Sequence, residues 1–146
     1  MPTRTARTAW NGGLNDGSGQ VELSSSKIGT YDVSFPKRAA EEANGSTSPE
    51  ELLAAAHSAC YAMQFSAILG EAGGTIEALD VKADVTLGPD PQGGFKLTGI
   101  ALTVVGEVSG IDEATFLKAA DDAKATCPVS KALTGVDITL NATLEQ

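Results

Sequence analysis

Positive charge is scarce in this sequence. Its 146 residues include 10 lysines and arginines against 19 aspartates and glutamates, which gives a formal net charge of −9 at pH 7. A chain this negative repels the phosphates of nucleic acids and the surfaces of anionic membranes before any specific contact forms. We therefore expect neither a nucleic acid nor a membrane as partner, which leaves small molecules and other proteins.

Cysteine and histidine are also rare. The chain has two cysteines, Cys60 and Cys127, and one histidine, His57. These three side chains do not form a recognisable zinc site, because a clear fourth ligand and the usual paired spacings are missing. No metal, flavin or haem motif is present elsewhere in the sequence, so we expect no cofactor.

Apolar segments suited to export or membrane insertion are missing as well. The N-terminal MPTRTARTAW contains two arginines without an apolar segment after them, and no stretch is expected to reach the length of a membrane span. We therefore expect a cytoplasmic protein. In a reducing compartment, a reactive thiol or a thiol pair that cycles explains two cysteines better than a permanent structural disulfide does.

The composition is that of an ordinary globular protein, with 42% hydrophobic and 20% charged residues. Without repeats, low-complexity runs or a long linker, residues 1–146 are expected to form a single domain with an α+β fold. Hairpin strands are expected in residues 5–35, a polar surface loop in 37–47, strands in 81–87, 97–108 and 136–144, and helices in 48–71, 112–125 and 128–133.

The helix over residues 48–71 has clear start and stop signals. Ser48 is the expected N-cap, Pro49 the first helical residue, and Glu51 the partner that closes a capping box, while Gly73 and Gly74 end the helix. Nearly all residues between are apolar or small, so the helix must be covered on most faces.

The two cysteines have different expected environments. Pro128 favours the first position of a short helix, which makes Cys127 its N-cap, where unpaired N–H groups lower the pKa of a thiol. Cys60 lies deep within its helix and gains no such help, so its activation needs a nearby cation. Arg38 is the arginine that the loop before the helix could supply.

Several of these segments resemble a known family. TSPEELLAAAHSACYAM, ATCPVS and the Lys37-Arg38 pair are together similar to the OsmC/Ohr proteins (osmotically inducible protein C and organic hydroperoxide resistance protein), closer to the OsmC branch. The resemblance runs from the hairpin at Trp10 through GEAGGTIEALDVKADVTL and SGIDEATF to the final strand.

The resemblance implies a thiol-dependent peroxidase that reduces organic hydroperoxides, and hydrogen peroxide more weakly, to alcohols. Cys60 would be the peroxidatic thiol that becomes a sulfenic acid, and Cys127 the resolving thiol that forms the Cys60–Cys127 disulfide. Arg38 and Glu50 fall where the family has its arginine and its glutamate. An outside dithiol, for which a lipoylated protein is a candidate, would reopen the disulfide. The implied fold has antiparallel sheets around a long central buried helix in an intertwined homodimer.

Helix geometry adds a constraint on these residues. Glu50 and Cys60 are ten positions apart, so their Cα atoms lie roughly 15 Å apart in one straight helix. One guanidinium can hardly contact both side chains. Either the helix breaks between them, or Arg38 and Glu50 of one subunit meet Cys60 of another, as in a homodimer with two shared sites.

Two alternatives remain. His57 lies one turn before Cys60, so the two could form the nucleophile and base of a cysteine hydrolase or acyltransferase. The chain could also be a non-catalytic dimeric binding module of a stress response, with both cysteines merely buried. For the peroxidase, Trp10, Tyr61 and Phe65 are candidates to line a pocket for the organic group of the substrate, but aromatic residues near a core helix more often belong to the core.

Overall fold

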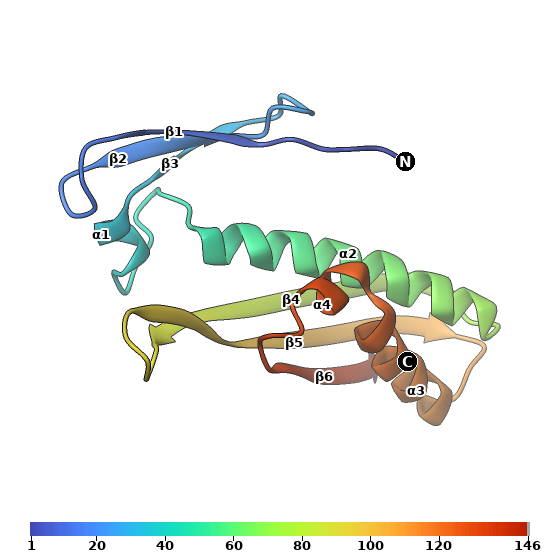
Figure 1. The fold of residues 1–146 in the computed structure, drawn as a ribbon. Helices are drawn as coiled ribbons and strands as arrows, with labels where there is room; N and C mark the ends of the chain where they lie inside the picture. Colours follow the sequence, from blue (N-terminus) through green and yellow to red (C-terminus); the bar gives the residue numbers. More distant parts are fainter. Residues whose placement is uncertain (146) are drawn as a thin grey trace. The chain divides into compact units, whose positions relative to one another are not determined.

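In the computed structural model, which describes residues 1–145, the chain divides into two compact units, residues 1–52 and residue 53 onward (Figure 1). The expected α+β fold is confirmed. The elements in chain order are β1 (Arg7–Asn11), β2 (Ser18–Glu22), β3 (Thr30–Val33), α1 (Phe35–Arg38), α2 (Pro49–Glu71), β4 (Thr75–Pro89), β5 (Phe95–Ser109), α3 (Glu113–Thr126), α4 (Pro128–Ala132) and β6 (Ile138–Glu145).

The first unit contains a three-stranded antiparallel sheet in the order β1-β2-β3, as expected from its hairpin signals. The glycines and Asp16 between β1 and β2 form the turn: Gly12 has a φ of 92°, and the Asp16 side chain accepts a hydrogen bond from the Gly13 N–H. Of the strand residues in this sheet, only Val21 is buried. The sheet therefore has little core of its own.

Helix α1 was not expected, because residues 37–47 read as a polar loop. The Ser34 hydroxyl accepts a hydrogen bond from the Lys37 N–H and caps the helix, and Pro36 suits its first turn. This single turn places Arg38 at the end of a helix rather than within a loop.

Helix α2 begins and ends where the sequence predicts. The Ser48 hydroxyl accepts from the Glu51 N–H at 3.1 Å, and Gly73, with a φ of 91°, follows the last turn. The capping box was only half right, since the Glu51 carboxylate accepts a hydrogen bond from the Thr47 hydroxyl at 2.6 Å.

One face of α2 is buried within the chain, and the rest is not. His57, Tyr61, Phe65 and Leu69 repeat every four residues and are all 0% exposed. Met63, on another face, is 72% exposed, so the description of a helix buried on most faces holds for one side only. An apolar helix surface is thus left open.

The expectation that no segment reaches the length of a membrane span was wrong. Helix α2 has 23 residues and a mean hydropathy of 1.4 over its most apolar window, which is long and apolar enough to cross a membrane. The core helix of a water-soluble protein passes the same test. One face of α2 packs in the hydrophobic core of the second unit, and 22% of this apolar window is buried.

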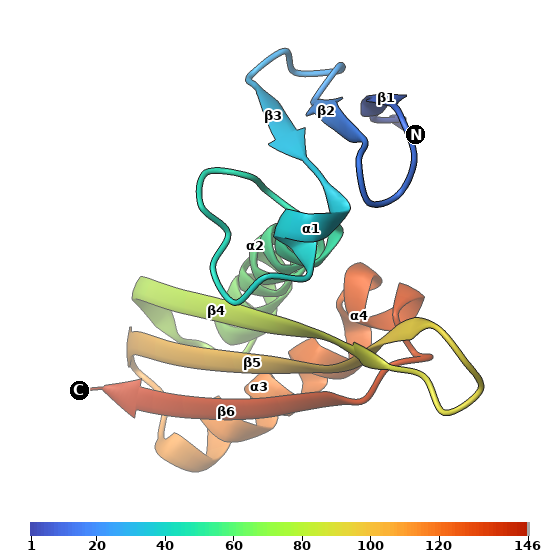
Figure 2. The same ribbon diagram turned by 90° about the vertical axis from the view of Figure 1, so that its left-hand side faces the viewer.

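The second unit contains the sheet β4-β5-β6 (Figure 2). Strands β4 and β5 form a long antiparallel hairpin, whereas β6 pairs with β5 in parallel. The expectation of purely antiparallel sheets was therefore wrong for this pair. Residues of α3 and α4 connect β5 to β6, and a crossover of this kind is what parallel pairing requires.

The core of the second unit lies between this sheet and the helices. Phe65 of α2 and Phe116 of α3 pack with ring centroids 5.1 Å apart. Alternate residues of β5, Ile100, Leu102, Val104 and Val108, are buried on the inner face. Asp112 caps α3 by accepting from the Thr115 N–H at 2.8 Å. This packing fixes the segment that follows α3, which carries Cys127.

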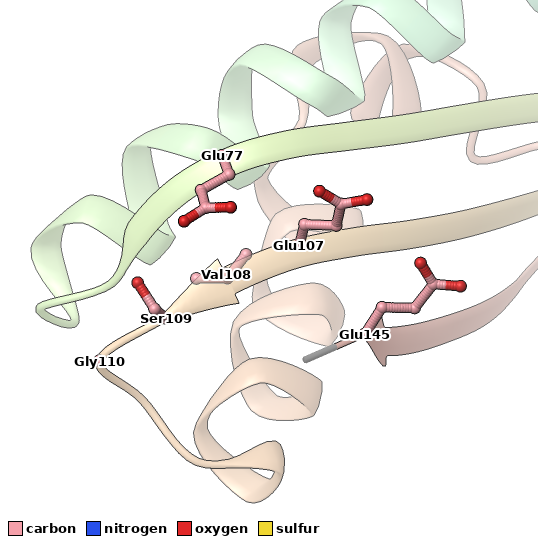
Figure 3. A pocket seen from close by; sticks show the side chains of 6 residues that line it. All are labelled: Glu77, Glu107, Val108, Ser109, Gly110 and Glu145. Carbon is pink, nitrogen blue, oxygen red and sulfur yellow. The ribbon is translucent and has the colours of Figure 1, made fainter.

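The outer face of the sheet carries a group of three glutamates at one end. Glu107 of β5 lies between Glu77 of β4 and Glu145 of β6 (Figure 3), and Glu107 and Glu145 are register partners. All three side chains are exposed. Like charges in this arrangement repel one another.

Candidate active site

Two sulfur atoms from distant parts of the sequence meet in the second unit. Cys60 comes from the middle of α2 and Cys127 from the junction of α3 and α4, 67 positions later, and their Sγ atoms are 3.2 Å apart. Both are free thiols, and Cys127 is fully buried. A disulfide needs a sulfur separation of about 2 Å, so a small movement would join them.

Cys127 is the N-cap of α4, as Pro128 predicts. Burial acts to raise the pKa of Cys127. Interactions with the Ser130 N–H, the Cys60 thiol, the Ser130 hydroxyl and the Val129 N–H outweigh it, so the pKa lies below its ordinary value. The expected helix-terminus effect on this thiol is thus present.

Cys60 is in the opposite electrostatic situation. Burial raises the pKa of Cys60, the Val129 N–H lowers it, and the neighbouring Cys127 sulfur raises it again, with a net upward direction. The chain's own second unit therefore does not activate this thiol. The inference that Cys60 needs a cation agrees with this result.

Arg38 and Glu50 meet in the first unit. The Arg38 Nε donates to both Glu50 oxygens, at 3.0 and 3.1 Å, and Nη2 donates to Oε1 at 2.7 Å. Glu50 is 8% exposed, which makes this a well-shielded, forked ion pair. Arg38 and Glu50 are the two residues that the family resemblance assigned to the site.

The His57 Nε2 atom contacts Ser130 rather than Cys60, so it is not placed to take the proton of the Cys60 thiol. The His57 Nε2 lies 2.7 Å from the Ser130 Oγ, and its Nδ1 has no hydrogen-bond partner among the residues that the structure describes. The ring thus lacks the carboxylate that orients the base of a cysteine hydrolase, which weighs against that alternative. Ser130 was missed by the sequence analysis, because nothing in the chain signals a contact across 73 positions.

The aromatic residues proposed for a substrate pocket have different places. Tyr61 and Phe65 belong to the hydrophobic core, as is usual for aromatic residues near a core helix, and the Tyr61 hydroxyl donates to the Ala120 carbonyl at 2.9 Å. Trp10 does line a mainly apolar hollow of about 290 Å³ in the first unit. Leu14, Phe35 and the guanidinium-bearing Arg38 line it too.

No group of three or more His, Cys, Asp and Glu side chains within residues 1–145 is arranged to hold a metal ion. The chemistry of this arrangement is that of a thiol pair. Two sulfurs in contact, one beside N–H donors, can exchange between dithiol and disulfide without a large rearrangement.

Comparison with known proteins gives a consistent result. Residues 42–141 match the model of the OsmC-like protein family. The chain is 41% identical over 136 residues to the peroxiredoxin OsmC of Escherichia coli (strain K12), which covers 93% of this chain and 92% of that protein. It is 31% identical over 117 residues to an organic hydroperoxide resistance protein-like 2 of Staphylococcus epidermidis, covering 77% of this chain and 79% of the relative.

Solved structures show the same architecture. An organic hydroperoxide resistance protein OsmC from Legionella pneumophila superposes with a TM-score of 0.77 at 28% identity, covering 98% of each chain. An organic hydroperoxide resistance protein from Elizabethkingia anophelis gives a TM-score of 0.79 at 25% identity, covering 99% of this chain and 98% of that one.

Proposed function

The chain belongs to the family of OsmC-like proteins, and from this membership we propose that it is a cysteine-based peroxidase that reduces organic hydroperoxides, and hydrogen peroxide more weakly, to alcohols and water. The observation that carries the proposal is the 3.2 Å contact between the Cys60 and Cys127 sulfurs. A binding module with two inert cysteines has no need of this contact.

The reaction begins at Cys60. Its thiolate attacks the outer oxygen of the hydroperoxide, the O–O bond breaks, and the alkoxide takes a proton and leaves as the alcohol, with Cys60 as sulfenic acid. The Cys127 sulfur then attacks the Cys60 sulfur, the S–O bond breaks, and the hydroxyl leaves as water. An external dithiol, such as a lipoylated protein, reduces the disulfide and becomes oxidised itself. A reducing compartment, the cytoplasm, suits this cycle.

Arg38 is the proposed activating cation. Its guanidinium would stabilise Cys60 as thiolate and hold the peroxide oxygens as charge develops, while Glu50 fixes its orientation. Helix α2 is continuous from Pro49 to Glu71, so the helix break that would let one guanidinium serve both Glu50 and Cys60 is not observed within it. We therefore assign the activating Arg38 to a second subunit of a homodimer.

Two open surfaces support a homodimer. On α2, Met63 and the alanines of the same side, Ala56, Ala59 and Ala67, are exposed although apolar. In the first unit, an almost entirely exposed three-stranded sheet presents Trp10 and Tyr31, each 42% exposed. Burying these apolar areas against a second copy would stabilise both.

The hollow at Trp10 supports a preference for organic peroxides. Its apolar lining suits an alkyl or aryl group, and Arg38 on the same lining would receive the peroxide oxygens. Hydrogen peroxide has no group to fill this space. This difference is the proposed reason for its slower reduction.

Intact-protein mass spectrometry tests the function. Reduced protein treated with one equivalent of cumene hydroperoxide should lose two protons per chain, as the Cys60–Cys127 disulfide forms, and an equivalent of cumyl alcohol should appear. Hydrogen peroxide should give the same product more slowly. Unchanged mass and unconsumed hydroperoxide would contradict the proposal, as would a stable acyl adduct from an ester substrate.

A further inference from the structure

A buried polar pair beside the two sulfurs has no part in the reaction described above. His57 and Ser130 are 0% and 4% exposed, come from α2 and α4, and join through a 2.7 Å contact between Nε2 and Oγ. Burying polar side chains costs free energy unless they are hydrogen-bonded, and this one contact uses only part of the hydrogen-bonding capacity of the two side chains. Because Ser130 lies only three residues after Cys127, the Cys127 sulfur is the candidate partner for the remaining hydrogen-bonding capacity.

The proton of the imidazole can be assigned from its surroundings. Burial lowers the pKa of His57, so the ring is neutral and carries one N–H. The Nδ1 atom has no partner among the described residues. Since an orphaned buried N–H is rarer than an unsatisfied acceptor, the proton belongs on Nε2, which then donates to the Ser130 oxygen.

This assignment fixes the Ser130 hydroxyl as well. Its oxygen accepts from His57, so its own hydrogen is free to donate to another acceptor. Ser130 lies in the first turn of α4, of which Cys127 is the N-cap, and both its hydroxyl and its N–H act to lower the pKa of the Cys127 thiol. A hydrogen bond aimed at a sulfur favours the thiolate over the thiol.

We propose that His57 and Ser130 are positioning residues for the resolving step: His57 holds the Ser130 hydroxyl toward Cys127, and this hydroxyl stabilises Cys127 as the thiolate that attacks the Cys60 sulfenic acid. The inference rests on the proposed peroxidase function. In this step an S–S bond forms, the S–O bond of the sulfenic acid breaks, and the departing hydroxide takes up the proton that the Cys127 thiol released. His57 and Ser130 keep their protons throughout.

The other titratable groups near Cys127 do not stabilise its thiolate in place of Ser130. Cys60 and Tyr61 approach from α2, and Asp121 of α3 acts on Tyr61. The pKa of Tyr61 is raised, chiefly by burial and further by the charges of Asp121 and Cys127, so the phenol stays neutral. Of these side chains, Ser130 is the one whose hydroxyl is held in place by the His57 ring. That ring has no second hydrogen-bond partner among the described residues.

The first experiment measures the Cys127 thiolate directly. In a Cys60→Ser background, the ultraviolet absorbance of the thiolate is followed against pH. Ser130→Ala and His57→Phe should each raise the pKa of Cys127, and a rise of one pH unit leaves about tenfold less thiolate at any pH well below the pKa. His57→Gln, which keeps an amide N–H for Ser130, should recover part of the effect. Ser58→Ala, which removes a hydroxyl bonded to the Ala55 carbonyl on the same helix, is the matched control.

The second experiment separates the two steps in the full chain. After one equivalent of hydroperoxide, Ser130→Ala and His57→Phe should oxidise Cys60 at the wild-type rate, form the disulfide about tenfold more slowly and accumulate sulfinic acid. If disulfide formation and the Cys127 pKa are unchanged, or only thermal stability falls, the positioning role is wrong. If the wild-type protein itself forms no disulfide, the peroxidase function fails instead. Should His57→Phe not fold, Ser130→Ala and His57→Gln decide the matter.

Discussion

At the scale of single residues, the two sulfurs differ in what surrounds them. Cys127 sits at the start of α4 beside N–H and O–H donors, and its pKa is lowered. Cys60 accepts a hydrogen bond from the Cys127 thiol and interacts with the Val129 N–H, yet burial and the Cys127 sulfur give its pKa a net upward direction. The thiol with the lower pKa is thus the proposed resolving one, and the proposal that Cys60 is peroxidatic therefore includes a cation, Arg38 of a second subunit, that lowers its pKa.

Substitution of each cysteine should separate their roles. Cys60→Ser should abolish hydroperoxide consumption, because no peroxidatic thiol remains. Cys127→Ser should consume one equivalent and then stall or over-oxidise, because the sulfenic acid has no resolving partner. Hydroperoxide consumption per chain, with mass spectrometry of the product, measures both. Equal loss from both variants at the first turnover would contradict the assignment.

The Arg38–Glu50 pair should matter through its geometry as well as its charge. Arg38→Lys keeps the charge but loses the fork, so kcat/KM for cumene hydroperoxide should fall on the order of 10²-fold. Glu50→Gln should also lower kcat/KM, because the Arg38 guanidinium loses the carboxylate that orients it. Arg4→Lys, a change at an exposed arginine, serves as the control. If Arg38→Lys had wild-type activity, the proposed role of the Arg38 guanidinium in the reaction would be wrong.

His57 should make stability depend on pH. Its pKa in the folded chain lies below the ordinary value of 6.5, so below that pH the unfolded chain binds a proton that the folded chain does not. Stability should therefore fall as the pH drops from about 7 toward 5, with a slope of up to about 1.4 kcal/mol per pH unit. Urea titrations of wild type and His57→Gln measure this, and the variant should lack that part of the slope. Parallel curves would show that His57 titrates normally.

At the scale of elements, the sequence was most informative where a local signal decides the structure. Ser48, Pro49 and Gly73 act through their own backbone neighbourhood, and the bounds of α2 were accordingly predicted correctly. The N-cap position of Cys127 follows from Pro128 in the same way. Residues whose role depends on chemistry within a few positions can be identified from the amino-acid order alone.

The features that the sequence missed depend on long-range packing. The parallel direction of β6 is set by how α3 and α4 cross the sheet, and alternation of apolar residues is the same in both directions. Ser130 is one of many small polar residues until His57 is placed against it.

The glutamates on the outer face of the sheet should destabilise it. Glu107→Lys replaces the repulsion from Glu77 and Glu145 by attraction, and the free energy of unfolding should rise by about 0.2–1 kcal/mol. Urea denaturation measures the change. Thr103→Lys, on the same face of β5 but opposite Lys82, should give no gain. A loss of stability in Glu107→Lys would mean that the acidic group is favourable in the folded protein.

At the scale of the whole molecule, oxidation should make the protein harder to unfold. The Cys60–Cys127 disulfide would close a loop of 67 residues, which stabilises a folded chain by about 4 kcal/mol in the loop-entropy treatment. The urea midpoint of protein oxidised with one equivalent of hydroperoxide should exceed that of the reduced protein. Cys127→Ser should show no such increase. A lower midpoint on oxidation would indicate that the bond strains the fold.

The order of the two cysteines along the chain also has a consequence during synthesis of the protein. Cys60 leaves the ribosome 67 residues before Cys127, which at ordinary elongation rates is roughly 3 to 13 seconds. Throughout that interval the nascent polypeptide carries the first sulfur without the second. A chain oxidised at position 60 within that interval has no second sulfur with which to form the disulfide.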